Sequence, residues 1–204
     1  MSHIRPVDVC LIVKDLFKDI NDQQIPVSVE NLVGVISHRL SVNSEAPYRI
    51  EIKGKNWPAN QLAGMMFRYD DRAEISYSVS FNRCWRRFII CKELTHLAID
   101  TEERHFTKNP ISLVQELINK VPAACDDDVH SEYLAYIGAA EMLLPWSLRN
   151  KMQEMMDQKK SDLEIANEFR APEKVVNLVL RSESYRRLSE EANSASDSSS
   201  SPGI

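Results

Sequence analysis

Hydrophobic residues recur with helical spacing along most of the chain and with the two-residue spacing of strands only in its middle. Helical spacing covers residues 8–19 and 27–40, and the second of these segments carries an apolar face. Between them and the next helical segment, residues 48–53, 62–69 and 73–79 have strand-like patterns. The last two strands are separated by only three polar residues, as in a hairpin. The pattern therefore predicts an α+β fold, mostly helical, with a small antiparallel sheet.

The segment at residues 82–100 follows this sheet directly and has apolar residues on nearly every side, which predicts a long helix surrounded by protein. Asn82 is well suited to cap its start. At about 100° per residue, one stripe of this helix carries Trp85, Ile89, Lys92, His96 and Asp100, with Glu93 at its edge. Burying these ionisable groups costs free energy unless they satisfy one another or a bound ion. We therefore look for chemistry on this stripe.

The remaining helices follow a polar connection at residues 101–110. We expect a helix at 111–120, an acidic loop at 125–130 and a helix at 131–144. Ala135, Gly138, Ala139 and Ala140 give that last helix a smooth side that lets another helix approach, and Glu132 lies in its first turn on that side. A helix from Pro145 to about residue 158 and two short helices within 161–182, broken near Pro172, complete the ordered chain.

The composition is that of one main domain with an appendage. The chain has 204 residues, 43% of them hydrophobic, and a formal net charge of −5. We divide it into a domain at residues 1–145, a helical region resembling a helix-turn-helix at 146–188, and a disordered tail at 189–204, where Ser, Asp and Asn lack an apolar anchor. The negative charge argues against a protein that coats nucleic acid or an anionic membrane.

No apolar run approaches the roughly 20 residues that a membrane span needs, and the first residues lack the apolar core of a signal peptide. We therefore expect a cytoplasmic protein. The four cysteines show no C-x-x-C spacing, and Cys84 and Cys91 lie about two helical turns apart, too far for a disulfide. Reduced, buried cysteines are the expectation.

Residues 92–96 read Lys-Glu-Leu-Thr-His, which is the frame of the zinc-peptidase motif H-E-x-x-H with lysine in place of the first histidine. In that motif the side chains at positions i and i+4 converge on a metal ion. The glutamate at i+1 deprotonates the metal-bound water and later protonates the leaving amine. A K-E-x-x-H sequence alone occurs by chance in many helices, so the interpretation depends on its surroundings.

Those surroundings resemble the ImmA/IrrE family of metallopeptidases over roughly residues 26–145. The shared features are a hairpin containing Leu62-Ala-Gly64, Arg86-Arg-Phe88 just before K-E-x-x-H, and a later helix with Glu132-x-x-Ala135 and Ala139-Ala-Glu-Met-Leu-Leu-Pro145. The resemblance implies a zincin-like fold with Glu93 as general base and zinc held by His96 and Glu132. It also implies a protein substrate or partner of the helix-turn-helix repressor kind.

Lys92 departs from the family pattern because an ammonium has three donors and no lone pair for a metal. Between Glu93 and Glu132 it can instead supply the positive charge that zinc supplies. Asp100, one turn beyond His96, is a possible substitute ligand, and His105 and His130 are further ones from loops. Two other departures are Gly138, where the family prefers Phe, and Tyr136, where it often has Asn.

Plainer interpretations stand beside these roles. His96 is equally a hydrogen-bonded core histidine, Glu132 a carboxylate favoured by a helix N-terminus, and Asp100 an exposed acid. Three functions stay open: a peptidase that uses zinc or manganese to cut a repressor-like protein, a pseudopeptidase that keeps the fold as a protein-binding module, and a DNA-binding regulator using residues 161–182. The last segment shows no basic stripe, so direct binding of nucleic acid is the least favoured.

Overall fold

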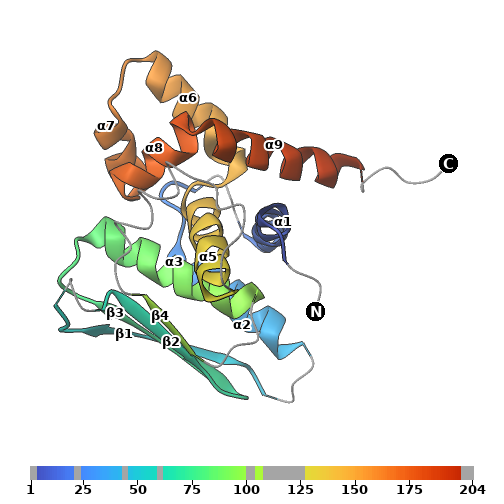
Figure 1. The fold of residues 1–204 in the computed structure, drawn as a ribbon, viewed down its shortest axis with the longest axis vertical. Coiled ribbons are helices and arrows are strands. Elements are labelled where there is room, and N and C mark those ends of the chain that lie inside the picture. The colour runs from blue at the N-terminus through green and yellow to red at the C-terminus, as the bar shows by residue number, and fades with distance from the viewer. Residues whose placement is uncertain are drawn as a thin grey trace.

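In a computed structural model of the protein, a small sheet is covered on one face by helices (Figure 1). The structure describes residues 4–20, 24–42, 46–58, 62–99, 104–107 and 127–198. The elements in chain order are α1 (Pro6–Leu16), η1 (Phe17–Asp19), α2 (Val29–Ser41), β1 (Arg49–Lys55), β2 (Gly64–Arg68), β3 (Arg72–Ser78), α3 (Arg83–Ile99), β4 (Arg104–Thr107), α5 (Asp127–Leu143), η2 (Trp146–Leu148), α6 (Arg149–Asp157), α7 (Asp162–Phe169), α8 (Glu173–Arg181) and α9 (Glu183–Ser198).

Local signals place most helix starts where the sequence predicts them. Asn82 Oδ1 accepts a hydrogen bond from the backbone N–H of Trp85 at 3.0 Å, so Asn82 caps α3. Ser161 caps α7 in a reciprocal capping box with Glu164. Arg170 then ends α7 in the left-handed conformation, with φ of 50°. The predicted break before Pro172 is thereby confirmed.

The helix α3 lies between the sheet and α5 and contacts both layers (Figure 1). The inner face of the sheet supplies Met66, Ala73 and Ile75 to the core. The same apolar cluster continues through α1 and α5 into α6–α9. The division of the chain at residue 145 stays a prediction, although one core spans that position.

The sheet has four strands in the order β1-β3-β2-β4 and is mixed rather than antiparallel. β2 pairs antiparallel with β3 as the predicted hairpin, whereas β1 runs parallel to β3, with Ile52 opposite Ile75. β4, which lies in the segment expected to be a polar connection, pairs antiparallel with β2. The prediction of an antiparallel sheet was wrong because alternation fixes which face of a strand is buried but not which strand lies beside it.

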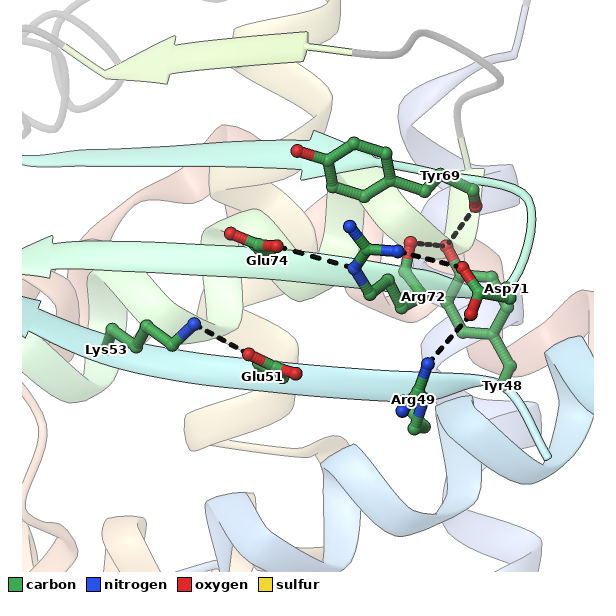
Figure 2. A network of polar contacts seen from close by, with 8 residues as sticks. All are labelled: Tyr48, Arg49, Glu51, Lys53, Tyr69, Asp71, Arg72 and Glu74. Atoms are coloured by element: carbon green, nitrogen blue, oxygen red, sulfur yellow. Dashed lines mark hydrogen bonds and ion pairs between the residues drawn. The ribbon is translucent and has the colours of Figure 1, made fainter.

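The outer face of the sheet carries charged side chains that pair with one another (Figure 2). Arg49 contacts Asp71 at 2.8 Å and Lys53 contacts Glu51 at 2.6 Å. Arg72 contacts Asp71 at 3.2 Å and Glu74 at 3.4 Å. The charges on this face are thus largely compensated within the sheet.

Two expectations for the second half of the chain were wrong. α5 begins at Asp127, so the end of the expected acidic loop is helical and Glu132 lies in the second turn rather than the first. The tail predicted to be disordered from Ser189 is helical to Ser198. Ser189 and Ala192 are buried, and Ser189 donates a hydrogen bond to the buried Glu141 at 3.1 Å.

The buried anchor of α9 is polar, which is why an apolar pattern did not reveal it. The carboxylate of Glu141 on α5 accepts hydrogen bonds from Arg149 at 2.7 Å and from the Tyr185 hydroxyl at 2.7 Å. Burial raises the pKa of Tyr185 well above its usual value, and the negative charge of Glu141 adds to the rise. The expected helix at 111–120 lies outside the described residues. No helix that the structure describes is both long and apolar enough to cross a membrane.

Candidate functional site

Two helices approach each other closely enough for their polar side chains to meet. A Cβ atom added at Gly138 of α5 would lie 2.3 Å from Cγ2 of Thr95 on α3, so only glycine fits there. Ala135 and Ala139 on the same side of α5 are fully buried. The Thr95 hydroxyl donates to the Cys91 carbonyl of its own helix at 2.9 Å. The smooth side predicted for this helix is therefore its contact with α3.

The side chains of Lys92, His96 and Glu132 converge one to two turns away from this contact. Lys92 Nζ lies 3.0 Å from Glu132 Oε1 and 3.2 Å from Glu132 Oε2. It also lies 3.2 Å from His96 Nε2 and 3.3 Å from Glu93 Oε1. His96 Nε2 is in turn 2.9 Å from Glu132 Oε1. The ammonium thus contacts all three side chains that the zinc-peptidase resemblance assigns to catalysis and metal binding.

This cluster is buried, which makes its charge balance important. The side chains of Lys92, Glu93 and His96 have 0% exposure, and that of Glu132 has 20%. Burial acts to raise the pKa of Glu132, but the His96 hydrogen bond and the positive charge of Lys92 outweigh it and lower that pKa to about 2. Glu132 is therefore an anion at neutral pH and holds the ammonium in place.

The contacts of His96 indicate which group donates to which. The distance from Nε2 to Glu132 Oε1 is shorter than the distance to Lys92 Nζ, which favours an Nε2–H that donates to the carboxylate. Ser131 Oγ lies 3.4 Å from Nδ1, the other ring nitrogen. In this arrangement Lys92 directs its protons at the two glutamates.

The sheet also contributes to the site through Gly64 at the start of β2. A Cβ atom there would lie 2.8 Å from Glu93 Oε1 and 2.4 Å from Cγ2 of Ile89. Glycine at this position lets the carboxylate of Glu93 sit against the strand. The sequence signal was present, since Gly64 belongs to the hairpin that carries the family resemblance.

Tyr136 borders the site and was not among the predicted functional residues. Its hydroxyl is buried and has no hydrogen-bond partner among the described residues. Burial raises its pKa well above the usual value, and the negative charges of Glu132 and Glu93 raise it further. Its position four residues after Glu132, on the same side of α5, was the signal that could have identified it.

The predicted substitute ligands do not complete this cluster in the described structure. Asp100 and the side chain of His105 lie outside the described residues. His130 lies in α5 rather than in a loop, and its Nε2 is 3.1 Å from the carbonyl oxygen of Ile4. His130 therefore contacts the N-terminal segment.

The residues present do not fit a zinc site. Zinc needs lone-pair donors about 2.0–2.3 Å from the ion, whereas the Lys92 ammonium offers only protons and contacts both candidate ligands, which also contact each other. In the part of the chain that the structure describes, no three His, Cys, Asp or Glu side chains are grouped so as to hold a metal.

Comparison with known proteins adds no family assignment. The sequence matches no protein-family model, and no curated protein matches it.

Proposed function

We propose that this protein is an ImmA/IrrE-like, zincin-like fold in which the Lys92 ammonium replaces the metal ion, and that it binds a helix-turn-helix repressor-type partner without cutting it. The single observation that carries the proposal is the position of Lys92 Nζ, 3.0 Å from Glu132 and 3.2 Å from His96. These are the two side chains that the resemblance assigns to the metal. A metallopeptidase-like fold with this substitution is suited to binding rather than to hydrolysis.

The chemistry of an ammonium supports binding rather than hydrolysis. Zinc acts as a Lewis acid, lowering the pKa of a bound water to about 7 and polarising the carbonyl that is attacked. An ammonium can neutralise Glu132 and Glu93, but it has no vacant orbital for a water or a carbonyl oxygen. Glu93 then has no acidified water to deprotonate, and its carboxylate serves to hold Lys92.

The C-terminal helices favour the same class of function over direct DNA binding. Arg181 on α8 is paired with Asp162 on α7 at 2.6 Å, and Asn177 donates to the same carboxylate at 3.0 Å. These polar groups, which a recognition helix would direct to DNA, are bonded within the protein. The pairing supports a structural role for α7 and α8.

Metal analysis of the purified protein tests the proposal. After incubation with zinc and gel filtration, we expect the wild-type protein to retain far less than one zinc per chain. Lys92→His should bind zinc much more strongly, because it restores a lone-pair donor beside His96 and Glu132. The double variant Lys92→His with Glu132→Gln is the control, since it removes a ligand again and should lose the zinc.

One tightly bound zinc per wild-type chain would overturn the proposal. The part of the proposal that concerns the partner is tested with purified helix-turn-helix repressors from the same genome. Biolayer interferometry measures binding, and intact-mass spectrometry detects cleavage. Binding at unchanged mass is the expected result. A cleaved repressor, or no repressor bound at all, would contradict it.

A further inference from the structure

A groove with an apolar floor lies between the first half of α2, the inner face of β1 and β3, and the first turns of α3. Its volume is about 480 Å³, and its floor includes Val33, Ile50, Ile52 and Ile90. This volume is within the range of roughly 300–1,000 Å³ seen for ligand pockets. The groove lies outside the Lys92 cluster and shares no residue with it.

Two arginines on the rim of the groove have no ion-paired carboxylate among the residues that the structure describes. Arg83 and Arg87 lie one turn apart on α3 and face Glu30 of α2. Arg87 donates to the carbonyl oxygens of Val27 at 2.7 Å and Arg170 at 3.1 Å, which are neutral acceptors. Within the described ranges, no carboxylate lies within ion-pair distance of either Arg83 or Arg87.

With two arginines and the single carboxylate of Glu30, the rim carries an excess of positive charge. Burial lowers the pKa of Arg87 from its usual value, the negative charge of Glu30 acts against this, and the positive charges of Arg170 and Arg83 act with it. The first turn of α3 contains no acidic residue, although a helix N-terminus favours anions. The outer face of the sheet is different, because Arg49 and Arg72 are paired there with acidic side chains (Figure 2).

The groove also adjoins the edge of the sheet. β1 is the first strand in the order β1-β3-β2-β4, so one of its backbone edges pairs with no other strand that the structure describes. Ile50 and Ile52 of this strand form part of the floor. A peptide in extended conformation can hydrogen-bond to such an edge while its side chains enter an adjacent pocket. A free small anion could not use this edge.

We propose that this groove binds a short extended segment of a partner protein. In that segment an acidic side chain reaches Arg83 and Arg87, and a neighbouring aliphatic or aromatic side chain packs on Val33, Ile50 and Ile52. The inference does not depend on what occupies the Lys92 cluster. It adds a peptide-binding site to a molecule whose other site is internal.

Selection from a random nonapeptide phage library on the full-length protein is the first test. We expect enriched sequences that place Asp or Glu next to an aliphatic or aromatic residue. The proposal is overturned if no sequence is enriched, or if the enriched sequences lack an acidic residue.

Fluorescence polarisation with one enriched, labelled peptide then locates the site. Arg83 is exposed and makes no hydrogen bond or ion pair with the described residues, so Arg83→Glu should fold normally and weaken binding about tenfold. Arg83→Lys should stay within about threefold of wild type, because it keeps the charge. Arg186→Glu on α9 is the control. It changes the net charge by the same amount at a residue that does not line the groove, and it should leave binding unchanged.

Equal weakening by Arg83→Glu and Arg186→Glu would show an effect of net charge alone and would overturn the site. Methyl chemical shifts give a second readout, since the peptide should shift the methyl signals of Val33, Ile50 and Ile52. Unshifted signals at all three would also overturn it. None of these variants touches Lys92, so the outcome is separate from that of the metal analysis.

Discussion

Gly138 of α5 faces Thr95 of α3 so closely that a single added carbon at Gly138 would lie 2.3 Å from the threonine methyl group. This contact brings α5 near enough to α3 for Glu132 to reach Lys92 and His96. The geometry of the polar cluster therefore depends on a residue that takes no part in its chemistry.

Replacement of Gly138 by alanine should separate the two helices. We expect Gly138→Ala to lower the free energy of unfolding by about 1–3 kcal/mol, because the new methyl group overpacks a closed contact. Urea denaturation measures this. Gly34→Ala in α2 is the control, since a Cβ atom there meets nothing within 4 Å, and it should stabilise by up to about 1 kcal/mol. Equal effects of the two substitutions would contradict the close contact.

Removal of the Lys92 ammonium should be costly because it leaves two carboxylates together in a buried site. We expect Lys92→Met to lower the free energy of unfolding by about 3–5 kcal/mol. Adding Glu132→Gln to this variant should restore part of the loss, because it removes one of the unpaired charges. A double-mutant cycle by chemical denaturation measures the coupling. Simple additivity of the two changes would argue that Lys92 and Glu132 do not interact.

The pKa of Glu132 predicts a specific loss of stability in acid. Its folded-state pKa of about 2 lies below the usual 4.5, so its contribution is fully present above about pH 4.5 and is lost as the pH falls towards 2. The shift corresponds to a contribution of roughly 3 kcal/mol to the free energy of unfolding at neutral pH. We expect the difference in unfolding free energy between wild type and Glu132→Gln to be largest at pH 6 and to shrink at pH 3. A difference that does not change with pH would contradict the ion pair.

The buried carboxylate of Glu141 should hold α9 on the body of the protein. Glu141→Gln weakens the acceptor for Arg149, Tyr185 and Ser189 and leaves the Arg149 guanidinium without its anion. We expect faster hydrogen–deuterium exchange across α9. The free energy of unfolding should fall by about 2–4 kcal/mol. Arg186→Gln, which breaks only exposed pairs on α9, should leave exchange near wild type. Unchanged exchange in Glu141→Gln would show that other contacts hold the helix.

Local patterns in the sequence predicted a large part of the fold. Helical spacing located α1, α2 and α3, and the cap residue Asn82 located the start of α3. Period-two alternation located the first three strands and their buried faces. Helical geometry also placed Lys92 and His96 on one side of α3. All of these follow from interactions within a few residues, which a sequence displays directly.

Only the tertiary structure decided which elements lie side by side. The parallel pairing of β1 with β3, the contact of His130 with Ile4 and the polar anchor of α9 on Glu141 each join residues distant in the sequence. The convergence of Lys92 on Glu132 is of the same kind, since it depends on how closely α5 packs on α3. Periodicity fixes the side of an element that is buried, whereas its neighbour is chosen by packing and by the pairing of buried charges, which only the folded chain brings together.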